Sequence, residues 1–226
     1  MIRHLFCIAI ALGGYAGLQA QIGVHAAYTS SMADEWNHVA KAGEATSFEL
    51  PGTGWTAGID YWFRLKKLRI EFLPTLAFSH LQADAATATT DFSTVLNGLH
   101  FSWNTNIYLF DLKGDCDCPT FSKEGPSLHK GFFVQIAPGI SYLDFNINDP
   151  SGDIASSDTA FHLGIGTGVD IGLSDFLTIT PQVGARYYPT ATWTGLGAYH
   201  SALSSGIMDE SPLWLFNAGL RIGFRW

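Results

Sequence analysis

The chain has 226 residues, of which 47% are hydrophobic, and it carries a formal net charge of −8 at pH 7. This acidity disfavours a nucleic-acid-binding role, because phosphate recognition relies on lysine and arginine. The 24 glycines and nine prolines interrupt the apolar residues so often that no stretch beyond residue 20 predicts a transmembrane helix.

The first twenty residues have the organisation of a secretory signal peptide. Arg3 provides a positive start, an apolar run follows from Leu5 to Leu12, and a Leu-Gln-Ala tripeptide precedes Gln21. The apolar run is shorter than the ~20 residues of a spanning helix, which makes an N-terminal anchor the less favoured alternative. We therefore expect residues 1–20 to be a signal peptide and residues 21–226 to form one mature domain.

Eight segments alternate between apolar and polar residues, as β-strands do when their two faces meet different environments. They are Ile22–Ser30, Gly54–Leu65, Leu68–Leu81, Leu99–Leu112, Gly131–Phe145, Thr159–Leu173, Phe176–Pro189 and Leu213–Trp226. Each supplies roughly the ~9–11 residues of a transmembrane strand, and an even number of strands closes without a free edge. The sequence predicts an all-β fold: an eight-stranded antiparallel up-and-down transmembrane β-barrel in the cell outer membrane.

The connections between these segments alternate in length. Lys66-Lys67 and Ser174-Asp175 are tight turns, which we place on the periplasmic side. The long connections are Ser31–Thr53, Gln82–Asn97, Asn146–Asp158 and Thr190–Pro212. We expect these long, acidic loops to face the outside, their charge serving solvation rather than a cation site. Residues 113–130 form a long connection on the periplasmic side, against the general rule.

Parity along the strands predicts which charged side chains face the lumen. They are Asp60, Arg64, Arg69, Glu71, Asp170, Arg186, Arg221 and Arg225. Side chains fill the interior of an eight-stranded barrel, and buried charges require partners. We therefore expect a packed ionic network that closes the lumen, and favour it over a narrow conducting path.

Four glycines of the sixth segment lie on its lumen face: Gly164, Gly166, Gly168 and Gly172. No helix follows them, which disfavours a nucleotide-binding loop. We interpret them as space for large side chains from other walls, with Tyr108, Trp62 and Phe110 as candidates.

Three prolines, Pro74, Pro138 and Pro181, lie at similar depths in the third, fifth and seventh segments. This weak repeat suggests duplication of a hairpin. Each proline removes one hydrogen-bond donor from a closed sheet, so we expect β-bulges near them.

The last segment ends on aromatic residues, Phe224 and Trp226. It resembles the terminal strand by which the barrel-assembly machinery recognises its substrates. Signal peptide, eight hairpin-linked strands, mid-strand prolines and aromatic terminus together resemble the small outer-membrane β-barrel families of the Bacteroidota, including the PorT-like group. The resemblance implies outer-membrane lipid and the assembly machinery as partners. The PorT-like group is implicated in the type IX secretion machinery.

Cys116 and Cys118 lie in the long periplasmic connection. Three interpretations stay open: an oxidised pair or simple turn in an oxidising compartment, contact with a periplasmic partner, or part of a metal site. Two cysteines do not complete a tetrahedral zinc site, and His129 is a distant third candidate.

Three functions fit these features. The favoured one is a non-enzymatic barrel, structural or an accessory subunit of an envelope complex, with residues 113–130 contacting a protein partner and no cofactor. The second is a lipid-modifying enzyme, for which His100 with Ser102, or His80 with Asp84, are the candidate groups. The third is a narrow channel for small solutes, which the bore disfavours.

Overall fold

The computed structural model describes residues 21–36, 50–65, 68–86, 91–110, 112, 131–148, 154–174, 176–197 and 208–225. Its strands are β1 (Gln21–Met32), β2 (Thr53–Arg64), β3 (Ile70–Ala86), β4 (Asp91–Ile107), β5 (Phe132–Asn148), β6 (Ile154–Val169), β7 (Ile171–Gly172), β8 (Leu177–Thr192) and β9 (Glu210–Arg225). No helix in the described ranges is long and apolar enough to cross a membrane.

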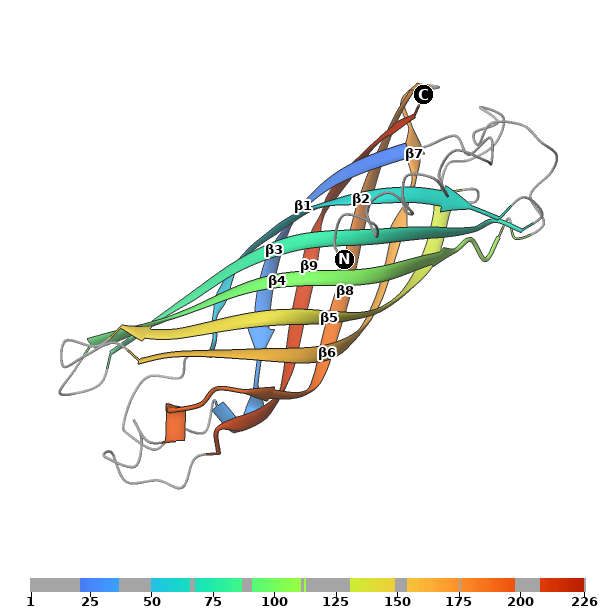
Figure 1. Cartoon of the computed structure of the whole chain (residues 1–226). Coiled ribbons are helices and arrows are strands. Elements are labelled where there is room, and N and C mark those ends of the chain that lie inside the picture. Colours follow the sequence, from blue (N-terminus) through green and yellow to red (C-terminus); the bar gives the residue numbers. More distant parts are fainter. Residues whose placement is uncertain are drawn as a thin grey trace, which may run out of the picture.

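All strands belong to one closed antiparallel sheet (Figure 1). Neighbours in sequence pair from β1 to β6, β1 also pairs with β9, and β9 pairs with β8. The circle closes because β8 pairs with β6 and, further along, with β7. Since β6 and β7 follow one path beside the same neighbour, the nine labelled strands form an eight-stranded barrel. The predicted fold class is confirmed.

The two ends of the barrel differ in their connections. One end, called the turn end here, carries the short links from β2 to β3 and from β7 to β8, together with the paired residues Gln21 and Arg225. The opposite end, called the loop end, carries the tips of the β3–β4 and β5–β6 hairpins and the links that follow β1 and β8.

Strands reach further toward the loop end than the sequence predicted. The expected loop over residues 82–97 is wrong, because β3 continues to Ala86 and β4 begins at Asp91. The expected loop over residues 146–158 is also too long, since β5 ends at Asn148 and β6 begins at Ile154. Strands of 16 or 17 residues exceed the ~9–11 that a tilted strand needs to span a bilayer, so part of the barrel extends beyond it.

The alternation of apolar residues reverses along the strands, and β5 shows the reversal most directly. Ile140 and Tyr142 point outward, with 50% and 51% of their surface exposed, whereas Leu143 and Phe145 point inward and are fully buried. On the turn-end side of this point the outer face of the strand is apolar. On the loop-end side the inner face is apolar. The expected segments stopped near this level because their apolar parity stopped there.

The same reversal occurs at a similar level in other strands. It falls between Phe78 and Leu81 in β3, Leu96 and Leu99 in β4, and Leu215 and Phe216 in β9. Beyond it, outward positions are polar and exposed, as at Gln82 and Asp84. The barrel therefore has a membrane section with an apolar outside, and a loop-end section with a polar outside and an apolar core.

The three prolines interrupt hydrogen-bond ladders without shifting the strand register. The β2–β3 ladder has a gap at Pro74, the β4–β5 ladder at Pro138, and the pairing of β8 with β6 and β7 at Pro181. On its other side each proline stays in register with its neighbour. The expected bulges at the prolines are therefore wrong; the register shift in the described pairings lies between Tyr188 and Ala191.

Candidate functional site

The outer face of the membrane section is an apolar surface that runs around the whole barrel. Every strand path contributes exposed large side chains, for example Val24, Ile59, Leu76, Phe101, Ile140, Leu163, Val183 and Leu220. Apolar patches of this extent are unfavourable in water, and a closed sheet leaves no unpaired backbone edge facing lipid. An apolar outer face around a polar interior is the arrangement of an outer-membrane barrel. The protein is located in the outer membrane.

The lumen of the membrane section contains a buried ion pair. Arg221 on β9 donates from Nε to Asp60 Oδ2 at 2.8 Å and from Nη2 to Oδ1 at 2.6 Å. Both residues are less than a tenth exposed. A Cβ at Gly23 would lie 2.5 Å from Arg221 Nη2 and from Asp60 Oδ2. The pair therefore occupies the space that this glycine of β1 leaves open.

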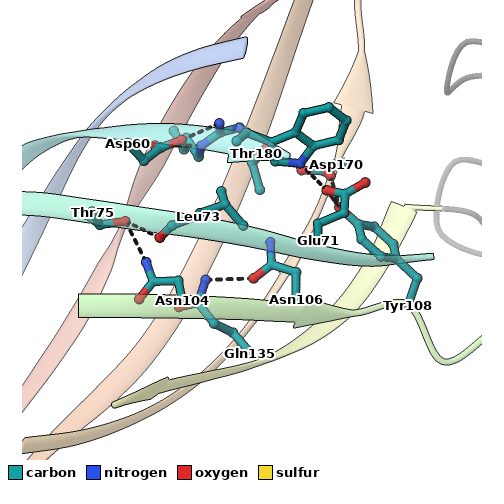
Figure 2. Close-up of polar contacts among 12 residues, drawn as sticks. Asp60, Glu71, Leu73, Thr75, Asn104, Asn106, Tyr108, Gln135, Asp170 and Thr180 are labelled. Atoms are coloured by element: carbon teal, nitrogen blue, oxygen red, sulfur yellow. Dashed lines mark hydrogen bonds and ion pairs between the residues drawn. The ribbon is translucent and has the colours of Figure 1, made fainter. Parts of the chain in front are cut away.

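Toward the turn end, Glu71 and Asp170 face each other across Tyr108 (Figure 2). The Tyr108 hydroxyl donates to Glu71 Oε2 at 2.8 Å and also contacts Asp170. Trp62 Nε1 donates to Glu71, and the Thr180 hydroxyl donates to Asp170. Neutral donors thus contact both carboxyl groups.

The lumen arginines differ in their surroundings. Arg69 is buried, and its guanidinium lies 4.2 Å from the centroid of the Tyr108 ring, a cation–π distance. Arg186 lies on the inward face of β8 and lines a cavity. The side chains of Arg64 and Arg225 lie outside the described residues. Among the described residues, the lumen of the membrane section contains the Asp60–Arg221 ion pair and a neighbouring carboxyl cluster.

A chain of serine and histidine side chains crosses the lumen between the ion pair and the loop end. Ser79 Oγ lies 2.7 Å from His100 Nε2, and His100 Nδ1 lies 2.7 Å from Ser141 Oγ. Ser141 Oγ lies 3.0 Å from His162 Nδ1, and His162 Nε2 lies 3.0 Å from Ser102 Oγ. These side chains come from β3, β4, β5 and β6, so the chain of hydrogen bonds links four strands.

Tyr188 joins this serine–histidine chain from β8, the strand next to β6. Its hydroxyl lies 3.0 Å from Ser141 Oγ and 3.2 Å from His100 Nδ1. Glycines provide the room for both imidazoles. A Cβ at Gly98 would lie 2.5 Å from His100 Cε1, and one at Gly139 would lie 2.5 Å from His162 Nε2. Small residues opposite large ones fill a narrow barrel in this way.

Of the β6 glycines, Gly168 faces a large side chain, but not one of the predicted ones. A Cβ at Gly168 would lie 2.6 Å from Phe133 Cζ, and one at Gly164 would lie 2.9 Å from Ala137 Cβ. Gly172 is exposed near the turn end. The proposed roles of Tyr108, Trp62 and Phe110 opposite these glycines are therefore wrong.

An aromatic core fills the lumen of the loop-end section. The Phe145 and Trp193 rings stack with centroids 4.9 Å apart, and Trp36 meets both edge-on at 5.4 and 5.5 Å. Trp36 and Trp193 follow the ends of β1 and β8, so the first residues after these two strands enter the mouth of the barrel. Leucines and other apolar residues surround these rings: Leu81, Leu96, Leu143, Ile147, Leu213 and Leu215.

Other predicted site residues fall in parts of the chain that the structure does not describe. Cys116, Cys118, the whole connection 113–130, the signal peptide and Trp226 lie outside the described residues. Phe224 is half-buried, and its ring contacts Phe176 at 5.8 Å between centroids.

Sequence reasoning named His100 and Ser102 as candidate groups but did not predict which side chains they contact. Parity along one strand predicts the inward face, whereas the contacts of His100 with Ser141 and of Ser141 with His162 depend on the registers of β4–β5 and β5–β6. The signal in the sequence was limited to polar residues at inward positions on consecutive strands.

No family model matches the chain, and no curated protein matches its sequence. Among solved structures, a major outer membrane protein from Thermus thermophilus is 15% identical, covers 92% of this chain and 99% of its own, and gives a TM-score of 0.48. Neisserial surface protein A is 12% identical over 93% of this chain and 100% of its own, with a TM-score of 0.47. The outer membrane protease OmpT from Escherichia coli is 6% identical over 94% and 99%, with a TM-score of 0.46. These names include a protease and a surface protein, and no activity is common to them.

Proposed function

We propose that the protein is a non-enzymatic outer-membrane barrel with a closed lumen, which serves as a structural element or an accessory subunit of an envelope complex. The observation that carries this proposal is the aromatic core of Trp36, Phe145 and Trp193, which fills the lumen of the loop-end section. A solute path would have to pass through side chains packed at van der Waals distance.

The positions of the candidate catalytic groups support a non-enzymatic role. His100 contacts Ser79 and Ser141, whereas Ser102 contacts His162. All these groups are less than a twentieth exposed, and no described carboxylate hydrogen-bonds to either histidine. A nucleophile needs a base, an orienting group and access for substrate, and a lipid on the outer face reaches none of them.

His80 and Asp84, the candidate groups for lipid chemistry on the outer face, contact other residues rather than each other. His80 Nδ1 lies 2.8 Å from Asn97 Oδ1, and Asp84 accepts a hydrogen bond from Gln82. Replacing His80 and His100 by Gln, singly, tests the enzyme alternative through the mass of lipid A in cells. An unchanged mass spectrum in both variants supports the present proposal, and the loss of a lipid A modification in either one contradicts it.

The accessory role assigns partner contact to residues 113–130. The turn end is otherwise built from short links, and this connection supplies lysines, acids and the Cys116–Cys118 pair in one segment. The resemblance to the small barrels of the Bacteroidota, with the PorT-like group among them, belongs to this proposal. In it the two cysteines contact the partner or pair with each other, rather than bind a metal.

Lysine cross-linking in intact cells tests the accessory role. The wild-type protein and a variant with Lys66 and Lys67 replaced by Arg should capture the same stoichiometric partner, identified by mass spectrometry. A variant with Lys113, Lys123 and Lys130 replaced by Arg should lose it. Capture of the partner by that triple variant, or of none by the wild type, would contradict docking through this connection.

Planar-bilayer recordings test the closed lumen separately. The purified barrel should insert without a stable ion conductance. A variant with Trp36 and Trp193 replaced by Ala serves as the comparison, because these side chains fill the mouth. Reproducible conductance steps from the wild-type barrel would contradict the closed lumen.

A further inference from the structure

The membrane section of the lumen contains a cavity of about 90 Å³. Three residues without side chains beyond Cα, Gly164, Gly184 and Gly219, form part of its wall. Because a water molecule in the liquid takes up about 30 Å³, the cavity has room for a few waters or for one small ion with a water. It lies beside the Asp60–Arg221 pair, both members of which also line it.

Arg186 projects into this cavity from β8 without a partner. Its guanidinium makes no hydrogen bond or ion pair with any described residue, and Nη1 is completely buried. The residues paired with it across the sheet, Gly164 on β6 and Leu215 on β9, offer no side-chain acceptor. A buried donor without an acceptor costs about 1–3 kcal/mol, and more when it is charged, so this group calls for an acceptor inside the cavity.

The charged residues that line the cavity carry one more positive than negative charge. The described charged residues that line it are Asp60, Arg186 and Arg221. Asp60 uses both carboxylate oxygens on Arg221, so no carboxylate of the cavity wall pairs with Arg186. Neutral polar groups, among them the amides of Gln182 and Asn217, complete the wall. Water would satisfy the hydrogen bonds of Arg186 but would leave its charge unbalanced.

We propose that the cavity binds one small monovalent anion of the halide type against Arg186. Such an ion accepts hydrogen bonds from the guanidinium, neutralises the single excess charge, and fits the volume with a water beside it. A phosphate-like dianion would bring more negative charge than Arg186 balances. This anion site is independent of any docking partner and concerns the interior of the barrel alone.

Thermal unfolding in detergent provides the first test, with chloride exchanged for gluconate at constant ionic strength. Gluconate is too large for the cavity. The melting temperature should rise with chloride along a saturation curve, by about 3–6 °C at ten times the dissociation constant. Arg186→Gln should abolish the rise. Arg69→Gln, which removes another lumen arginine that does not line the cavity, should keep it.

Bromide supplies a second test on the wild-type protein, which does not depend on the folding of any variant. A crystal soaked in bromide should show an anomalous peak within hydrogen-bond distance of the Arg186 guanidinium. An empty cavity at this position would overturn the proposal. So would a wild-type melting temperature that does not respond to chloride, a response that Arg186→Gln retains, or one that Arg69→Gln also loses.

Discussion

Asp60 and Arg221 are 161 residues apart in the chain and are joined by two hydrogen bonds, of 2.8 and 2.6 Å, inside the lumen. They belong to β2 and β9, which both pair with β1. In register, Asp60 lies opposite Gly23 of β1. The pair therefore crosses over a glycine and ties the second strand of the chain to the last one, next to the place where the first and last strands meet.

Removing one member of this pair should destabilise the barrel strongly. Arg221→Met leaves the Asp60 carboxylate buried without its partner, and we expect a loss of about 3–5 kcal/mol in the free energy of unfolding. Urea unfolding in lipid vesicles measures it. The double variant Asp60→Asn with Arg221→Met should recover part of the loss, because no unpaired charge remains; equal stability of both variants would contradict this account.

Filling the space under the pair should have a related effect. In Gly23→Ala the new Cβ would lie 2.5 Å from atoms of both Asp60 and Arg221, so the pair has to move, at a cost of about 1–3 kcal/mol. Gly184→Ala is the matched control, since its nearest neighbour would lie at 3.0 Å. Urea unfolding should give Gly23→Ala a clearly lower free energy of unfolding than Gly184→Ala.

Ser141 connects two imidazoles, and its removal should loosen both. In Ser141→Ala, the Nδ1 atoms of His100 and His162 lose their serine partner. We expect a loss of about 1–3 kcal/mol and changed ¹⁵N shifts of both histidine rings in NMR spectra. His80, which contacts Asn97 instead, should keep its shift. Unchanged shifts of His100 and His162 would show that Ser141 does not bridge them.

The core of the loop-end section should behave like that of a water-soluble β-domain. Phe145→Ala creates a cavity among fully buried rings, and we expect it to cost about 3–5 kcal/mol. Tyr142→Ala on the same strand removes a ring from the exposed outer face and should cost much less. Urea unfolding can compare the two variants provided that both insert into lipid. Insertion is checked by the heat-dependent gel mobility that folded barrels show.

The reversal of apolar parity should mark the edge of the bilayer. Spin labels at positions 78 and 82 point outward from β3, on either side of the reversal. In a background with Cys116 and Cys118 replaced by Ser, electron paramagnetic resonance should find the label at 78 accessible to oxygen and that at 82 accessible to a water-soluble nickel reagent. Equal oxygen accessibility at both sites would show that the membrane section continues beyond the reversal of apolar parity.

Period-two alternation was enough to predict the strand number, the antiparallel order and the inward face. It failed at the loop end because a parity rule assumes one environment along each strand. Leu143 and Phe145 have the opposite parity to Ile140 and Tyr142. The predicted segment ended at Phe145, just after this change, and the residues that follow were expected to form a loop. A reversal that recurs in consecutive hairpins would have indicated longer strands with a second core.

The site was predictable as a set of residues and not as a set of contacts. The inward positions included Asp60, Arg221 and Asp170. They did not indicate that Tyr108 and Thr180 contact Asp170. Which side chains meet depends on register and on the glycines that leave room, such as Gly23. Neither follows from the sequence of a single strand.

The polar outside of the loop-end section has a consequence for biogenesis. Both described ends of the chain lie at the turn end, which the sequence predicts to be periplasmic. For a barrel that inserts from that side, the hairpin tips at the other end have to cross the hydrocarbon. On the β3–β4 hairpin the crossing groups include the outward Gln82 and Asp84, whose transfer into hydrocarbon is unfavourable. Insertion thus meets its main barrier in the part of the barrel that ends up outside the bilayer, and an assembly factor that thins or opens the membrane would accelerate the translocation of these tips.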